Sequence, residues 1–529
     1  VNKFGQTIEL IFFSQVPKFI WAYLKLGKTV TVQGKISLFA NQVQLAHPEV
    51  VFNLNLIKMI EPIYPLTQGV NNSQLHGYIL CCLNHLEEIS PWHDLEKQLA
   101  LPTIRQSLIN IHDPSDLEDI ERYLKRMALE EVLINQYLMN QIRYKNKLPR
   151  EGSKATGLCY EKQVISNLGF SPTPEQEKAL AEISKDQQAG MRMIRMLQGD
   201  VGCGKTLVAL LSMLKLIKEG KQCCIMAPTE VLSVQHLKFF QKALNNTGIN
   251  VGLLTSSIKG EGRKQLLSQL LDGEINVLIG THALFQEQII FKNLAYVIID
   301  EQQRFGVQQR LDLLYKGKKA DLLLMSATPI PRTMSMIMYG DMDVSYIKAK
   351  PKNNLQIITN IMSTNKMPEL VASLNSIFAR SEKVYWICPL IEESEHKAYS
   401  NVTLRYEALR QVYGQRVGLL HGGMSQMQKN QTMLDYRDGS LDLLVATTVI
   451  EVGVDVASAT LIVIEDAPAF GLSQLHQLRG RVGRNDLQSY CILLYQPKLI
   501  NEIGKKRLSI LKNNNDGFEL AEQDLYLRG

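Results

Sequence analysis

The chain has 529 residues, of which 45% are hydrophobic and 21% charged, a composition that excludes a disordered protein and a length that excludes a single hydrophobic core. The net charge of +6 does not by itself establish nucleic-acid binding, and no apolar run reaches the roughly 20 residues that cross a membrane. Because no cysteine pair has C-x-x-C spacing and the first residues, 1–5, do not form a basic-then-apolar signal pattern, we expect no zinc site, no disulfide framework and a cytoplasmic protein.

Short β-prone runs separated by turn residues occupy residues 1–55. These runs are residues 6–13, 29–36 and 42–46. Several short strands with glycine turns predict a small β-barrel, for which the oligonucleotide-binding type is one candidate. In that case Phe12, Phe13 and Trp21 would stack on bases. The alternative is that these aromatic side chains belong to the core of the barrel.

Residues 56–150 change to helical periodicity, seen most clearly at residues 116–127. They contain no chemical motif, so we expect a helical layer that connects the barrel to the rest of the chain. The polar segment 145–152 contains Pro and Gly and marks the end of this layer.

Buried strands alternate with amphipathic helices in two consecutive stretches, residues 151–350 and 351–500. Such alternation predicts βαβ units and a parallel sheet in each stretch. The predicted fold class is therefore α/β, with two tandem parallel-sheet domains after the small β-barrel and the helical layer.

A complete phosphate-binding motif, G-x-x-x-x-G-K-[ST], occupies residues 199–206 between an apolar strand and a helix. In such a phosphate loop, backbone N–H groups surround the phosphates at a helix N-terminus. We expect Lys205 to reach the β- and γ-phosphates and the Thr206 hydroxyl to bind Mg²⁺. The expected nucleotide contacts come from Gly199, Asp200, Val201, Gly202, Cys203, Gly204, Lys205 and Thr206. A glycine-rich turn before an ordinary helix is the alternative.

Two carboxylates, Asp300 and Glu301, follow a buried strand of the same domain. An acidic strand end is common, but behind a phosphate loop we expect Asp300 to hold the metal and Glu301 to polarise the attacking water. The two motifs together predict binding and hydrolysis of a nucleoside triphosphate with Mg²⁺.

The second α/β domain carries two arginines three positions apart behind a glycine, Arg481 and Arg484. We expect them to act as arginine fingers that stabilise charge on the γ-phosphoryl group when the two domains close. The alternative is a basic, solvated helix face.

Taken together, the pattern resembles superfamily 2 helicases and translocases, whose motor consists of two tandem RecA-like domains. The segments that carry the resemblance are residues 170–176, 227–230, 280–282, 326–328 and 446–455. The resemblance implies that Gln176 reads adenine and selects ATP, and that Gly453 and Asp455 also face the nucleotide.

The same resemblance assigns the remaining motif residues to DNA and to coupling. Thr229, Thr281 and Thr447 would contact the nucleic-acid backbone. Ser326 and Thr328 would couple hydrolysis to domain motion.

Five further segments resemble the RecG family of bacterial ATP-dependent DNA branch-migration helicases. They are residues 300–307, 327–333, 339–345, 420–424 and 516–525. The barrel, with His47-Pro48-Glu49, is similar to the wedge domain of that family, and residues 501–529 to the start of its translocation motif. The resemblance implies remodelling of stalled forks and branch migration of Holliday junctions in recombination and repair. It further implies a nucleoid-associated monomer that acts on branched DNA.

Three departures from the family pattern affect these expectations. Gln303 stands where the family has His, near the γ-phosphate, so it should still hydrogen-bond while coupling is altered. Cys203 replaces the usual Ser in a loop whose backbone makes the contacts. The sequence starts inside the wedge and ends within the translocation motif, so we expect a chain truncated at both ends.

Three other functions are compatible with the motifs. They are a junction-binding fragment with an uncoupled ATPase, a transcription-repair coupling translocase and an RNA helicase. The β-barrel and helical layer favour a fork wedge over a polymerase-binding module, and no residue pattern indicates recognition of a 2′-hydroxyl.

Overall fold

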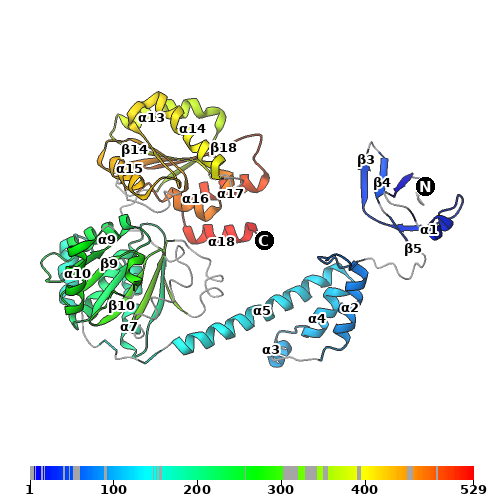
Figure 1. The fold of residues 1–529 in the computed structure, drawn as a ribbon, viewed down its shortest axis with the longest axis horizontal. Coiled ribbons are helices and arrows are strands. Elements are labelled where there is room, and N and C mark those ends of the chain that lie inside the picture. Colours follow the sequence, from blue (N-terminus) through cyan, green and yellow to red (C-terminus); the bar gives the residue numbers. More distant parts are fainter. Residues whose placement is uncertain are drawn as a thin grey trace. The chain divides into compact units, whose positions relative to one another are not determined.

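The computed structural model divides into two units, Val1–Asn135 and Gln136–Gly529, and each is considered by itself (Figure 1). It describes residues 5–528 except 6, 13–15, 17, 40–41, 47, 52–59, 88–91, 147, 150–151, 154–157, 257, 287, 302–319, 328–341, 349–355, 390–394, 449–455, 457 and 484–486. Within the described residues, no helix is both long and apolar enough to cross a membrane.

The N-terminal β-region contains two small sheets and one short helix. Strands β1 (Ile8–Ile11), β4 (Gln42–Ala46) and β3 (Ile36–Phe39) form a three-stranded sheet in that order, while β2 (Thr31–Gln33) pairs antiparallel with β5 (Glu49–Val51). Helix α1 (Lys18–Tyr23) follows β1. Leu45 is buried on the central strand β4, so the described part of this region has a small apolar interior.

The helical layer follows as α2 (Asn72–Asn84), α3 (His93–Gln98), α4 (Ile104–His112) and α5 (Leu117–Asn146). Helices α2 and α4 each start with a capping box, in which the cap side chain and a glutamine three positions later bond to each other's backbone N–H groups.

A buried ion cluster fixes this layer. The Arg126 guanidinium donates to Glu96 at 2.6 Å and to Glu130 at 2.7 Å, and all three residues are buried. Its Nε donates to the carbonyl of Pro102. Because every buried charge has an opposite partner, the cluster is tolerated and joins α3 to α5.

The first sheet of the second unit has seven strands, all paired in parallel, which confirms the predicted sheet. In spatial order these are β12 (Asp343–Ile347), β6 (Ile194–Gly199), β11 (Asp321–Ser326), β10 (Leu294–Ile299), β7 (Gln222–Met226), β9 (Val277–Gly280) and β8 (Val251–Leu254).

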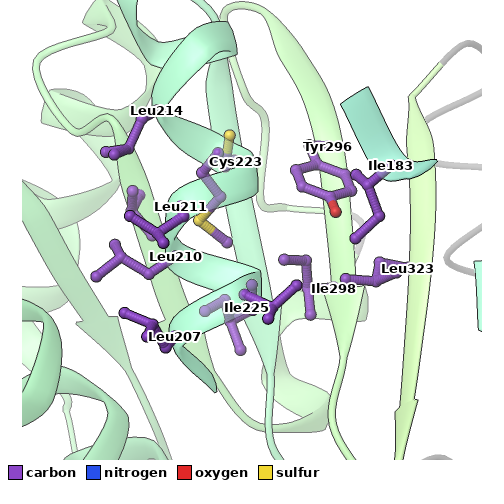
Figure 2. Close-up of a cluster of buried hydrophobic side chains, with 14 of the residues drawn as sticks. Ile183, Leu207, Leu210, Leu211, Leu214, Cys223, Ile225, Tyr296, Ile298 and Leu323 are labelled. Atoms are coloured by element: carbon purple, nitrogen blue, oxygen red, sulfur yellow. The ribbon is translucent and has the colours of Figure 1, made fainter. Parts of the chain in front are cut away.

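Helix α8 (Lys205–Lys218) packs centrally on one face of the first sheet. Leu207, Leu210, Leu211 and Leu214 recur at helical spacing and meet Cys223, Ile225, Tyr296 and Ile298 of β7 and β10 (Figure 2). Helices α6 (Leu158–Leu168), α7 (Pro174–Gln188) and α9 (Glu230–Ala243) join this core, whereas α10 (Gly260–Asp272) packs with the opposite face. With both faces covered, the strands are apolar on both sides, as parallel sheets require.

The second sheet has six strands, again all parallel. In spatial order these are β13 (Ile358–Ser363), β18 (Tyr490–Tyr495), β17 (Ala459–Ile464), β14 (Lys383–Ile387), β16 (Leu443–Ala446) and β15 (Val417–Leu420). Counted along the chain, the strand order 1-6-5-2-4-3 is that of the first sheet without its edge strand β12.

Alternating residues of β14 divide the helices of the second sheet between its two faces. Trp386 packs with α13 (Met367–Phe378) and α14 (Glu395–Tyr413), whereas Ile387 packs with the opposite set. That set is α15 (Gln426–Asp438), α16 (Leu472–Arg479), α17 (Glu502–Asn513) and α18 (Gly517–Arg528). The C-terminal helices are therefore part of the second core.

Candidate active site

The phosphate loop joins β6, which ends at Gly199, to α8, which begins at Lys205. Gly202 and Gly204 have φ angles of 80° and 83°, a region that side chains with a Cβ rarely adopt. A Cβ on Gly204 would also lie 2.3 Å from Nε2 of Gln176. The glycines therefore let the backbone turn at the positive N-terminus of a 14-residue helix, where phosphate groups are favoured.

Lys205 is buried and its ammonium group lies within this loop. Nζ donates to the carbonyl of Gly199 at 2.8 Å and to that of Asp200 at 3.0 Å. A cation held by two neutral carbonyls at a helix N-terminus fits an anionic ligand, because phosphate oxygens would replace these contacts with stronger, charge-assisted ones.

Gln176 supports the loop from α7. Its Nε2 donates to the carbonyl of Cys203 at 2.8 Å, and its Oε1 accepts from the backbone N–H of Thr173 at 2.8 Å. The described contacts thus join Gln176 to the phosphate loop itself. Its expected contact with adenine stays a prediction.

Asp300 follows the last residue of β10 and is held by two hydrogen bonds. Oδ2 lies 2.9 Å from Nε2 of His236 on α9, and Oδ1 accepts from the backbone N–H of Glu301 at 3.0 Å. Burial opposes the charged carboxylate, but His236, Lys205 and the Glu301 N–H together lower the pKa of Asp300. The ionised form is the one that binds Mg²⁺, so this residue fits its predicted role.

Glu301 has a φ of 51°, in the left-handed region that residues other than glycine seldom occupy. Such backbone strain concentrates at functional sites, where the surrounding fold holds it in place. The turn starts directly after the metal-binding candidate and before the segment that contains Gln303.

Two predicted DNA contacts occupy equivalent places in the two sheets. Thr281 follows β9 and Thr447 follows β16, the fourth strand of each sheet along the chain. Both are buried, and among the described residues neither hydroxyl has a hydrogen-bond partner. Thr229 instead caps α9, where its hydroxyl accepts from the N–H of Leu232.

Seven more predicted site residues belong to the second unit, of which the structure describes Ser326 and Arg481. Ser326 is buried at the end of β11, opposite Gln198 of β6, and Arg481 is half-buried after α16. Five further site residues lie outside the described residues: Gln303, Thr328, Gly453, Asp455 and Arg484.

In the N-terminal unit, Trp21 is 59% exposed on α1, while Phe12 is half-buried directly after β1. Phe13 and His47 lie outside the described residues. The exposure of Trp21 suits a base-stacking side chain, and the roles of both described aromatics stay predictions.

Two histidines at the site belong to no sequence motif that would have predicted them. His236 bonds to Asp300, and His476 of α16 lies 2.8 Å from Oδ1 of Asp200 in the phosphate loop. A pattern search does not find them because each meets its partner only through the tertiary fold. His476 does have one local signal, since Arg479 lies one helical turn away on the same face.

Comparisons with known proteins agree with this arrangement of two sheets. The family described as DEAD/DEAH box helicase matches residues 173–337, and the family described as helicase conserved C-terminal domain matches residues 366–486. The ATP-dependent DNA helicase RecG of Staphylococcus aureus is 41% identical over 99% of this chain and 77% of its own length. That of Staphylococcus epidermidis is 40% identical over 99% and 76%.

Solved structures give the same result. A RecG structure bound to a three-way DNA junction matches 98% of this chain and 69% of its own, with 36% identity and a TM-score of 0.76. Yeast Dbp5 bound to RNA and ADP BeF3 matches 70% of this chain and 96% of its own at 17% identity and a TM-score of 0.52, which shows a shared fold alone.

Proposed function

Since the chain belongs to the family of the ATP-dependent DNA helicase RecG, we propose that it acts on branched DNA, remodelling stalled forks and branch-migrating Holliday junctions. The observation that carries the proposal is the phosphate loop with its buried lysine, placed in a two-sheet motor. A relative solved on a three-way junction supports this choice of substrate.

The ATP-binding side of the proposal rests on the first sheet. Lys205 would exchange the loop carbonyls for β- and γ-phosphate oxygens, and Thr206 and Asp300 would hold Mg²⁺, which neutralises charge on the phosphates when bound. Glu301 would orient and polarise the attacking water. Because the surroundings lower the pKa of Asp300, its carboxylate is ionised at neutral pH and can bind a metal ion.

The second sheet would complete the reaction. Arg481, half-buried and one residue beyond the C-cap of α16, would stabilise charge on the transferred phosphoryl group together with Arg484. Because these arginines act only when the sheets close on ATP, hydrolysis would drive a cycle of closing and opening.

On the DNA side, Thr229, Thr281 and Thr447 would bond to backbone phosphates, which carry no sequence information. Phe12 and Trp21 would stack on bases at the wedge. We further propose that the protein works as a monomer in the cytoplasm, at the nucleoid.

The test is ATP turnover with and without a synthetic three-way junction, measured beside strand separation on the same sample. We expect the junction to stimulate turnover and the strands to separate, and Lys205→Ala to lose both while still binding the junction. Turnover without strand separation would instead favour the junction-binding fragment with an uncoupled ATPase. Absence of any turnover would contradict the assigned ATP site.

A further inference from the structure

We propose that Asp200 and His476 form a buried connection that passes the occupancy of the phosphate loop to the second sheet. The proposal rests on the ATP-driven function and assigns to it a positioning residue, His476. Neither residue belongs to a position that the phosphate-binding motif or the pair of arginine fingers specifies.

The hydrogen bonds of His476 define which of its two ring nitrogens carries the hydrogen. A guanidinium only donates, so Nη2 of Arg479, 2.8 Å from Nδ1 of His476, requires a lone pair on Nδ1. The imidazole is therefore neutral and carries its hydrogen on Nε2. That N–H donates to Oδ1 of Asp200 at 2.8 Å. The carboxylate and the guanidinium are thus joined through one neutral ring, with exposed fractions of only 4%, 3% and 2% from Asp200 to Arg479.

Asp200 belongs to two networks at once. Its backbone carbonyl accepts from Nζ of Lys205 at 3.0 Å, and its side chain accepts from His476 and from the N–H of Val201 at 2.7 Å. When phosphate oxygens take over the Lys205 ammonium, the Asp200 carbonyl loses that partner. The change therefore starts at the residue whose side chain bonds to α16.

Val201, the next residue of the phosphate loop, also lies against α16. A Cβ on Gly480, the C-cap of α16, would lie 3.2 Å from Cβ of Val201. Glycine at this position lets the end of α16 approach the loop closely. The loop thus meets α16 through one polar and one apolar contact, one residue before the candidate arginine finger Arg481.

Arg479, the second partner of His476, is itself fixed by hydrogen bonds. Nη1 of Arg479 donates to the carbonyls of Leu511 at 2.7 Å and Asn514 at 3.0 Å, which follow in the C-terminal part of the second core. With its partner fixed, the imidazole can move only together with α16. A shift of Asp200 is therefore transmitted to the helix instead of being absorbed by a side-chain rotation.

The variants that test the connection are His476→Leu and His476→Gln. Leucine removes both hydrogen bonds. Glutamine keeps both, because its amide N–H donates to Asp200 and its amide oxygen accepts from Arg479. Ser473→Ala, on the same helix, is the matched control. Each variant is assayed in the full chain for the KM for ATP and for kcat with and without a three-way junction.

We expect His476→Leu to lower the junction-stimulated kcat at least about fivefold, the lower range of coupling between sites, with little change in the KM for ATP. His476→Gln should recover most of the loss, and Ser473→Ala should match the wild type. A double variant of His476→Leu with Asp200→Ala should lose less than the sum of the two single losses, because each single change removes the same hydrogen bond.

Two results would overturn the connection: wild-type stimulation in His476→Leu, or an equal loss in His476→Gln and His476→Leu. A purely structural role would lower thermal stability and affect KM and kcat together, without rescue by glutamine, and so also counts against the proposal. A wild-type chain without junction-stimulated turnover would overturn the proposed function, and the connection would fall with it.

Discussion

Apart from the edge strand β12, the two parallel sheets of the second unit share one strand order, but different residues follow their fifth strands, β10 and β17. After β10 the chain continues as Asp300-Glu301, and after β17 as Glu465-Asp466. In both pairs the second residue is left-handed, with φ of 51° and 46°. The shared framework thus reproduces even the strained turn.

The partners of the two acidic pairs differ. Asp300 bonds to His236 in the domain that holds the phosphate loop. Glu465 accepts from Arg405 and from the indole N–H of Trp386, which completes a half-buried ion pair. Asp300 accepts from one imidazole and one backbone N–H, whereas both oxygens of Glu465 already accept from the Arg405 guanidinium, so Asp300 has more lone pairs left for a metal.

The loops after the first strands show the same divergence. β6 runs into the glycine loop and α8, whereas β13 runs into the 3₁₀ turn η4 (Thr364–Lys366), capped by the Ser363 hydroxyl. No glycine with positive φ occurs in the latter turn, every residue of which is described. The sheet therefore places the two loops equivalently, and only the loop after β6 has the glycine geometry of a phosphate-binding motif.

The largest expected effect comes from comparing two lysines, one after the first strand of each sheet. Lys205→Ala should reduce ATP turnover by at least about 10²-fold, the range for removing one preorganised charge donor. Lys366→Ala, in the exposed turn after β13, should leave turnover unchanged. Steady-state kcat with a DNA junction is the measurement. Equal losses would mean that the two sheets are not chemically distinct.

Next are two glycines with positive φ, one in each domain. Gly439→Ala, at the C-cap of α15 with nothing within 4 Å, should cost only the about 1–2 kcal/mol of a left-handed alanine. Gly204→Ala should cost more and weaken nucleotide binding, because its Cβ would meet Gln176. Thermal unfolding and titration with an ATP analogue test this pair. Similar nucleotide affinity in both variants would contradict it.

The pH dependence of stability tests the Asp300 site. Its pKa is lowered by folding, so its ionisation stabilises the folded chain above the unfolded pKa of about 4. That contribution disappears as the pH falls through the lower folded pKa. The stability difference between wild type and Asp300→Asn should therefore shrink as the pH falls below about 4. A difference that grows on acidification would refute this protonation scheme.

A milder pair of substitutions tests how alike the two frameworks are. Ile299→Val and Ile464→Val each remove one methylene from a buried residue at the end of the fifth strand. Each should cost about 0.5–1.5 kcal/mol. Differential scanning calorimetry of both variants is the measurement. A much larger loss in one would show that the two cores are packed to different tolerances.

The motifs made of consecutive residues were predictable from the sequence. The phosphate loop, the strand before Asp300 and the alternation of strands and helices depend on local chemistry, and the two parallel sheets confirm that inference. The repeated strand order was not predictable, because it depends on which strands pair. His236 and His476 were missed for a similar reason, since they lie 64 and 276 positions from the aspartates they meet.

The buried cluster of Arg126, Glu96 and Glu130 in the helical layer constrains how this protein changes over evolutionary time. Loss of Arg126 leaves two buried carboxylates without their shared cation, at about 3–5 kcal/mol, whereas an apolar replacement of the whole cluster is tolerated. Descendants of this chain should therefore keep Arg126 or exchange all three residues together. Among homologues, variation at position 126 should be accompanied by variation at positions 96 and 130, although these residues have no part in the chemistry.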